Sequence, residues 1–140
     1  MTHPFVDMDV IVRLITGDDP KKQTAAKALF ERVEQGQLTL TAPDTVIADA
    51  VFVLSSPRLY HLPHPQVSAM LAALVRLPHF RVRNRPAVLR ALELYATVNR
   101  DFGDLLIVAS MEQAHANLLY SYDQGFDRFT TTSGIARREP

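Results

Sequence analysis

Four aspartates lie inside the apolar segments of this 140-residue chain or at their edges: Asp7, Asp49, Asp104 and Asp123. An isolated carboxylate is costly to desolvate, so a buried one must be paired, hydrogen-bonded or bound to a metal ion. If the fold gathers these four side chains, they repel one another, and a divalent cation is the natural counter-charge. Carboxylate oxygens suit Mg²⁺ or Mn²⁺, and such ions assist the hydrolysis of phosphodiester bonds.

Each of these aspartates also has a purely structural explanation. Asp7 could form an Asx turn at the end of a strand, and Asp123 could belong to a turn. Asp104 could complete a capping box with Asp101. Asp49 has the weakest structural explanation, because an acid in the middle of a helix is poor helix chemistry. Taken singly, the structural explanations are at least as good as metal binding.

Several other side chains could assist the same chemistry. Asp9 could be an auxiliary metal ligand, or it could cap the helix that follows. Ser121 could hydrogen-bond to Asp123 or to a metal-bound water, or it could be a plain turn hydroxyl. A guanidinium matches phosphate bidentately, although any single arginine could equally be solvated. The candidate phosphate contacts are Arg13, Arg58 and Arg100.

The remaining polar residues have simpler interpretations. We assign Asp18, Asp19 and Asp44 to helix caps and Asp127 to the surface, where it could serve as an outer acid. The five histidines do not have the spacing of a zinc site. Tyr60 lies in a proline-rich loop, where its ring could stack on a nucleic-acid base or hold the loop against the protein.

The composition is that of one globular domain covering residues 1–140, with 47% hydrophobic and 21% charged residues. The absence of cysteine excludes disulfides and thiolate metal sites. The start of the chain lacks the basic and long apolar regions of a signal peptide, and no apolar run is long enough to span a membrane. We therefore expect a cytoplasmic protein without a membrane segment.

The net charge is zero, but basic residues are concentrated in one segment. Between positions 76 and 100 the chain has arginines at 76, 81, 83, 85, 90 and 100 and a single acid, Glu93. A basic strip beside an acidic pocket could receive a phosphate backbone. On charge alone, a solvated arginine-rich surface explains the segment better.

Short apolar runs alternate with segments of helical spacing. Strands are predicted at residues 5–6, 38–41, 80–82, 118–120 and 129–131. Helices are predicted at 10–15, from Asp18-Asp19-Pro20 to Gly36, from a capping box at 41–44 to about 54, at 67–77, from Pro86 to 95, and at 101–116. This alternation predicts an α/β protein with three layers, α/β/α, around a short and mainly parallel central sheet. Asp7 and Asp123 then follow carboxyl ends of strands, where sites form in such sheets.

Five segments in this order resemble the PIN-domain ribonucleases, and in particular the VapC-type toxins of type II toxin–antitoxin systems. They are Phe5-Val6-Asp7-Met8-Asp9-Val10, residues 14–20, residues 46–54, residues 101–109 and Ser121-Tyr122-Asp123-Gln124-Gly125-Phe126. No single segment is specific, but their order and spacing over nearly the whole chain make a strong combined signal. Two positions depart from the family pattern: Asp9 replaces the usual Asn, and Asp49 replaces the usual Glu.

The resemblance implies a specific function for the acids. Asp7, Asp49, Asp104 and Asp123 are implied to be catalytic and to bind Mg²⁺ or Mn²⁺, with Asp9 as a further ligand. The implied activity is endonucleolytic cleavage of structured RNA, such as a tRNA or an rRNA loop. A homodimer and a cognate VapB-like antitoxin, which inserts a segment into the acidic groove, are the implied protein partners.

Two other functions fit the same residues. Asp49 is one methylene shorter than Glu, and Asp9 adds a charge that could raise the pKa of a neighbouring acid. Both departures would fit a catalytically weakened PIN-like module that binds RNA or protein. A housekeeping RNA-processing nuclease of the same fold is the third candidate.

Overall fold

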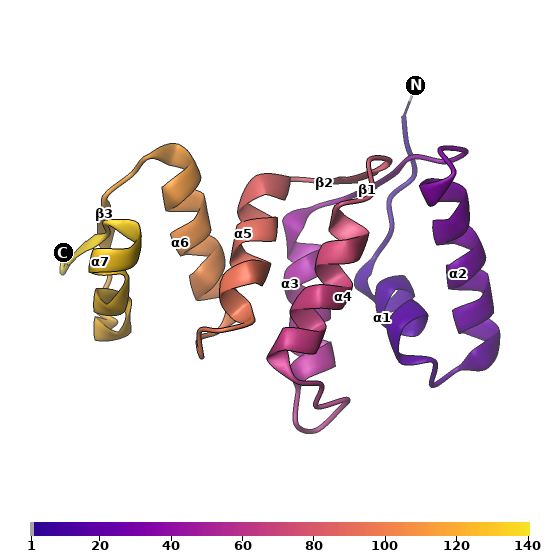
Figure 1. Cartoon of the computed structure of the whole chain (residues 1–140), viewed down its shortest axis with the longest axis horizontal. Coiled ribbons are helices and arrows are strands. Elements are labelled where there is room, and N and C mark those ends of the chain that lie inside the picture. Colours follow the sequence, from indigo (N-terminus) through magenta and orange to yellow (C-terminus); the bar gives the residue numbers. More distant parts are fainter. Residues whose placement is uncertain (1) are drawn as a thin grey trace.

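The structure, a computed structural model, describes residues 2–140. Its helices are α1 (Met8–Thr16), α2 (Pro20–Glu34), α3 (Asp44–Ser55), α4 (His64–Val75), α5 (Arg85–Tyr95), α6 (Phe102–Ala114) and α7 (Phe129–Ser133), with a 3₁₀ turn, η1 (Gln124–Arg128). Its strands are β1 (Leu40–Ala42), β2 (Phe80–Val82), β3 (Leu118–Tyr120) and β4 (Ala136–Arg138). The helices succeed one another along an elongated molecule, with α2 at one end and α7 at the other (Figure 1).

Local chemistry sets the boundaries of the first two helices. The Asp7 carboxylate accepts hydrogen bonds from the backbone N–H groups of Asp9, at 3.1 Å, and Val10, at 3.4 Å, and so caps α1. Gly17 ends α1 with a φ of 66°, a left-handed conformation that favours glycine. Asp19 caps α2 in the same way through the backbone N–H of Lys22, at 3.1 Å. Proline stands at the first position of α2, where its missing N–H costs nothing.

The strands confirm an α/β fold with short parallel strands, and they form two separate pairs. β1 pairs with β2, with Leu40 opposite Phe80, and β3 pairs with β4, with Leu118 opposite Ala136; both pairs are parallel. Phe5 adds a parallel bridge to Thr41 on the other side of β1. Helices α5 and α6 stand between the two pairs (Figure 1). The parallel strands predicted as one central sheet are therefore divided between the two halves of the molecule.

Three local predictions are wrong. Residues 129–131 form the start of α7 rather than a strand, and the last strand lies at 136–138. The physical reason is that Phe129 is buried against the core, and Gly134, with a φ of 67°, turns the chain so that Ile135 is buried next. The capping box predicted at 41–44 does not form, because Thr41 belongs to β1. Helix α3 begins at Asp44, after Pro43, without a side-chain cap, so the cap assigned to Asp44 is also wrong.

The core runs through the molecule between the helices. Phe80 is fully buried, and its ring meets that of Phe30 edge-on, with the centroids 5.5 Å apart. Ser68 is the buried polar residue of this core among residues 2–140, and its hydroxyl donates to the backbone oxygen of Leu92 at 2.6 Å. Within the described part of the chain, no helix combines the length and apolarity needed to cross a membrane.

Candidate functional site

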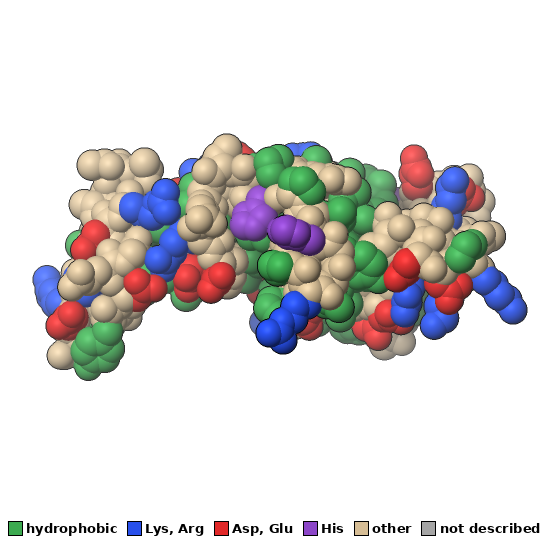
Figure 2. All heavy atoms as spheres, turned by 90° about the horizontal axis from the view of Figure 1, so that it is seen from below, with side chains coloured by type: hydrophobic (Ala, Val, Ile, Leu, Met, Phe, Trp, Pro, Cys, Tyr) green, Lys and Arg blue, Asp and Glu red, His purple; other side chains and the backbone are tan. Residues whose placement is uncertain are grey.

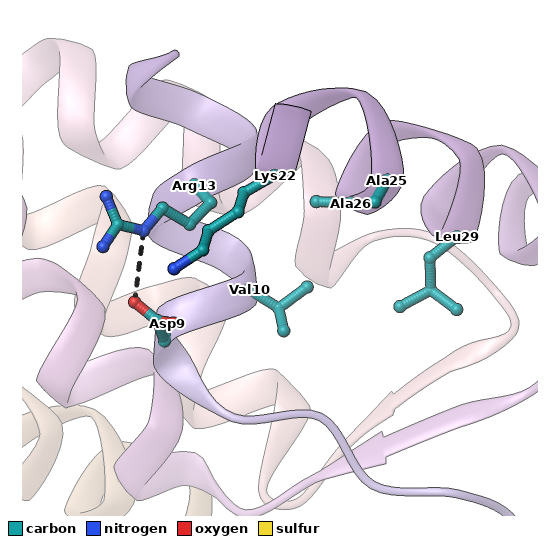
Figure 3. Close-up of a pocket in the computed structure, with 7 residues that line it drawn as sticks. All are labelled: Asp9, Val10, Arg13, Lys22, Ala25, Ala26 and Leu29. Atoms are coloured by element: carbon teal, nitrogen blue, oxygen red, sulfur yellow. Dashed lines mark ion pairs between the residues drawn. The ribbon is translucent and has the colours of Figure 1, made fainter. Parts of the chain in front are cut away.

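The first acid of the predicted set is exposed at the start of α1. One Asp7 oxygen caps the helix, so Asp7 is an N-cap rather than an isolated Asx turn, and Asp9 lies in the first turn and does not cap it. Asp9 instead pairs with Arg13, with 3.4 Å between Asp9 Oδ1 and Arg13 Nε. Figure 3 shows this ion pair at the rim of a pocket of about 360 Å³ between α1 and α2. Its interior is apolar, with Val10 and Leu29 pointing into it (Figure 3).

Asp18, assigned to a helix cap from the sequence, has a different role. Its carboxylate accepts hydrogen bonds from Arg13 Nη1, at 3.0 Å, from Thr16 Oγ1, at 3.0 Å, and from the Tyr60 hydroxyl. The bond from Tyr60 is the main cause that lowers the pKa of Asp18 to about 2. Tyr60 therefore fastens the loop between α3 and α4 to the end of α1. This confirms the prediction that its ring holds the loop against the protein. Asp19 caps α2 as predicted.

Arg100 holds two of the four candidate acids together. Its Nη2 atom lies 3.0 Å from Asp104 Oδ2 and 2.9 Å from Asp123 Oδ2. Asp104 is half-buried in the first turn of α6, and Asp101, the N-cap residue, makes no side-chain capping bond, so the predicted capping box does not form. Arg100 thus supplies the positive charge between these two acids.

Asp123 is held in a tight turn around the same arginine. Its Oδ1 atom accepts from the backbone N–H of Gly125 at 2.8 Å, and its own N–H donates to Ser121 Oγ at 3.0 Å. The turn role of Asp123 is confirmed. The Ser121 hydroxyl bonds to the backbone N–H of Asp123 and not to its carboxylate, which is the turn interpretation of Ser121. The Arg100 hydrogen bond and then that of Gly125 lower the pKa of Asp123. A Cβ atom at Gly125 would lie 1.9 Å from Arg100 Nη1, so glycine is what admits the guanidinium.

A wide groove contains Asp49, the remaining acid of the predicted set. Its volume is about 1370 Å³, and it runs between α3, the loop at 56–63 and the start of α6. Asp49 is exposed on α3, and Arg58 and Arg100, two of the predicted phosphate contacts, line the same groove. His64 also lines it and stacks on Tyr95 with ring centroids 4.1 Å apart. Figure 2 shows histidine side chains near the middle of the face on the underside of Figure 1, with acidic and basic side chains toward both ends.

The structure does not gather all four acids into a metal cage. Among residues 2–140, no three Asp, Glu, His or Cys side chains lie close enough to share one metal ion. The place between Asp104 and Asp123 that would suit a cation already holds the Arg100 guanidinium. A single chain in this conformation therefore does not offer a ligand set that fits Mg²⁺. Asp7, Asp49 and Asp123 are exposed, so the expected desolvation does not apply to them.

The basic segment at 76–100 is used partly for structure. Arg85 donates to the backbone oxygens of Leu77 and Phe80. Arg90 pairs with acids on its own helix and on α6, at 2.8 and 2.9 Å. The arginines at 76, 81 and 83 are exposed and have no ion pair in the part of the chain that the structure describes. The predicted basic strip is thus confined to these three.

The sequence analysis did not place Asp101 or His64 in the groove, and it did not predict that Arg100 pairs with Asp104. Asp101 and His64 line the groove beside Asp49, and no spacing in the sequence connects them with it. The pairing of Arg100 with Asp104 is not a helical pair either, because Arg100 precedes the N-cap residue of α6. Asp127, taken for a surface acid, is exposed and pairs with Arg137 at 2.9 Å.

Comparison with known proteins decides the family. Residues 5–131 match the PIN domain family, which is most of the chain. The chain belongs to the PIN domain family. PIN domains are in general nucleases that act on RNA, so the resemblance in the five segments is confirmed at the level of the family. A comparison with curated proteins found no match.

Removal of the arginine between the two acids tests this part of the PIN domain. We expect Arg100→Met to raise the pKa of Asp123, because the lost hydrogen bond is the main cause of its lowering. A lowered pKa stabilises the fold above the pKa of the unfolded chain and loses that effect as the pH falls through the folded value. The variant should therefore be less stable at pH 7, and the difference should shrink in acid.

The measurements are carboxyl titration by NMR and urea unfolding at several pH values. Arg81→Met is the matched control, because Arg81 is exposed on β2 and has no ion pair in the described residues. An unchanged titration of Asp123 in Arg100→Met would contradict the bridging role.

Proposed function

We propose that this PIN domain is a metal-dependent endoribonuclease and the toxin of a toxin–antitoxin pair. The observation that carries the proposal is the groove in which an exposed acid, Asp49, lies with two basic side chains, Arg58 and Arg100. Asp49 has no hydrogen bond or ion pair within residues 2–140, so its carboxylate is free for a ligand. Together with membership of the PIN family, this combination favours hydrolysis of a phosphodiester bond.

The residues of the groove suit a flexible, single-stranded RNA segment. The guanidinium of Arg58 is exposed and able to contact a phosphate bidentately. His64 and Tyr95 form a stacked aromatic pair in the wall, next to the exposed His61. Proteins select unpaired RNA loops by shape and stacking, which agrees with a tRNA or an rRNA loop as the substrate. Asp7, Asp49, Asp104 and Asp123 are the proposed catalytic acids, and Asp9 is a further proposed metal ligand.

The proposed setting is the cytoplasm, with a homodimer and a VapB-like antitoxin as partners. An antitoxin segment in the acidic groove would cover Asp49 and compete with RNA for the same arginines. The proposed cofactor is Mg²⁺ or Mn²⁺, since hard cations prefer carboxylate oxygens. We draw no catalytic step through the ion, because one chain does not assemble a ligand set for it.

A catalytically weakened binding module is the second candidate, and two observations favour it. Arg100 neutralises Asp104 and Asp123, and the departures at Asp9 and Asp49 change the charge and reach of two acids. Such a module would bind RNA in the groove without cleaving it.

Cleavage of RNA by the pure protein separates these functions. We expect cleavage with added Mg²⁺ or Mn²⁺, none with EDTA, and a loss of about 100-fold or more in Asp7→Asn. Asparagine is also a good N-cap, so α1 should stay intact in this variant. Asp19→Asn is the matched control, because it makes the same change at the cap of α2.

Three outcomes would be informative. Cleavage that survives both EDTA and Asp7→Asn would sink the proposed metal-dependent site. RNA binding without cleavage in any metal would support the binding module. Expression of the protein with and without an antitoxin encoded beside it, followed by mapping of RNA ends, tests the toxin role and identifies the target.

A further inference from the structure

The loop at residues 56–63, between α3 and α4, connects two parts of the molecule. Residues 56–58 and 61–63 line the groove that contains Asp49, whereas Leu59 and Tyr60 do not. Tyr60 packs against the core and reaches the end of α1 instead. In Figure 1 this loop and the turn between α1 and α2 project toward the same side of the molecule. The loop therefore joins the lining of the groove to α1.

Backbone hydrogen bonds close this loop into a compact turn. The N–H groups of Leu59 and His61 both donate to the backbone oxygen of Ser56, at 3.0 and 2.9 Å. His61 has a φ of 49°, a left-handed conformation that residues other than glycine adopt infrequently. Arg58 and Tyr60 both lie inside the closed turn. A side-chain contact that fixes Tyr60 therefore also fixes the backbone that carries Arg58.

The contact that fixes Tyr60 is part of a network built on α1. The Tyr60 hydroxyl donates to Asp18 Oδ2. The other oxygen, Asp18 Oδ1, accepts from Arg13 Nη1 and from Thr16 Oγ1, both at 3.0 Å. Arg13 is itself held by its ion pair with Asp9 (Figure 3). Two donors on α1 thus orient the carboxylate that receives Tyr60, and a hydrogen bond to a charged acceptor is a strong one.

The bond from Tyr60 to Asp18 keeps one protonation state around neutral pH. It is the main cause that lowers the pKa of Asp18 to about 2, and the main cause that raises the pKa of Tyr60. The tyrosine therefore remains a donor and the aspartate remains a charged acceptor. The bond is a permanent attachment of the loop and not a pH-dependent switch.

Of the three arginines predicted to contact phosphate, two are engaged in ion pairs. Arg13 pairs with Asp9 and Asp18, and Arg100 bridges two other acids. Arg58 is exposed, lines the groove and has no ion pair in the described part of the chain. The charge of Arg58 is thus the one left for a ligand of the groove, and its position depends on the loop.

We propose that Tyr60 is a positioning residue for RNA, because its bond to Asp18 holds the loop so that the Arg58 guanidinium meets a phosphate in the groove. This inference rests on the proposed function, since it concerns the same groove and the same ligand. A guanidinium on a loose loop loses conformational freedom when it binds, and a loop that is already fixed avoids part of that cost. An uncharged side chain outside the groove thereby sets the affinity of the groove for a polyanion.

RNA binding at several salt concentrations tests the proposal. The ligand is a short fluorescein-labelled oligouridylate, and EDTA is present so that the RNA is not cleaved. We expect Tyr60→Phe to weaken binding by about 5-fold at about 0.1 M salt and to lower the slope of log affinity against log salt by about 0.7, the effect of losing one phosphate contact on a single strand. Arg58→Met should cause the same two losses. In the Arg58→Met background, Tyr60→Phe should have no further effect.

The salt slope separates positioning from a purely structural role, because Tyr60→Phe removes no charge. Tyr120→Phe is the matched control, since it deletes a hydroxyl from a tyrosine that is 60% exposed and lies outside the groove. This control should bind RNA as the wild type does. An unchanged slope in Tyr60→Phe overturns the proposal. An equal loss of affinity in the presence and absence of Arg58 overturns it as well, because Tyr60 would then not act through Arg58.

A spin label reports on the loop without RNA, since the chain has no cysteine of its own. A nitroxide attached to Arg58→Cys should become more mobile when Tyr60→Phe is added. A nitroxide attached to Lys27→Cys, exposed on α2, should not change. Equal mobility at position 58 with and without the Tyr60 hydroxyl overturns the proposal. A wild type that binds no RNA would refute the proposed function instead, and the spin label would still decide whether Tyr60 holds the loop.

Discussion

Asp49→Ala is expected to lower the rate of RNA cleavage by about 100-fold or more while leaving the free energy of unfolding nearly unchanged. The carboxylate is exposed in the middle of α3 and has no hydrogen-bond or ion-pair partner within residues 2–140. Alanine is the best helix former, so the substitution removes no contact and costs the helix nothing. A loss of activity in this variant therefore reports on the reaction and not on folding. Steady-state cleavage of RNA and urea unfolding measure the two quantities.

Asp49→Glu tests whether a carboxylate at this position is enough for RNA cleavage. Asp49 is one methylene shorter than the glutamate usual in the family, so Asp49→Glu extends the reach of the carboxylate into the groove. We expect Asp49→Glu to keep far more activity than Asp49→Ala. Glu31→Ala removes an exposed acid from α2, outside the groove, and should leave cleavage unchanged. Full activity in Asp49→Ala would remove Asp49 from the catalytic set.

The local structure of this chain follows largely from short-range patterns. The strands at 80–82 and 118–120 are where the apolar runs predict them, and Asp19 with Pro20 begins α2 as helix-capping chemistry requires. These features depend on neighbours within a few residues, which the sequence shows directly. The strand predicted at 129–131 is wrong because the structure there depends on packing against distant parts of the chain. Three residues are too few to distinguish a strand from a helical turn, and the burial of Phe129 decides the outcome.

The site depends on contacts that no local pattern contains. The bond from Tyr60 to Asp18 joins residues 42 positions apart, and it turns an expected cap into the anchor of a loop. Arg100 reaches Asp123, 23 positions away, only because Gly125 leaves room for the guanidinium. The sequence identified the acids and the arginines as candidates. Which acid would pair with which arginine depended on the packing of α6 against the turn after β3.

Phe80→Ala is expected to have the largest effect on stability, a loss of about 3–5 kcal/mol in the free energy of unfolding. Phe80 is fully buried, packs edge-on against Phe30 and stands opposite Leu40 in the pairing of β1 with β2. Because domains of this kind are stable by only about 5–15 kcal/mol, such a loss is a large part of the total. Urea unfolding measures it as a lower midpoint with an unchanged slope.

Phe52→Ala provides the matched control for the loss of stability. Phe52 is 72% exposed on α3, so the same deletion should change stability by no more than about 0.5 kcal/mol. If both variants lose equally little stability, Phe80 does not hold the β1–β2 pair.

The core is connected to the site through β1. Strand β1 binds the segment at residues 4–6 through Thr41, and Asp7 directly follows that segment. Under conditions where Phe80→Ala is still folded, a looser β1–β2 pair should therefore lower cleavage as well, although Phe80 lies outside the groove.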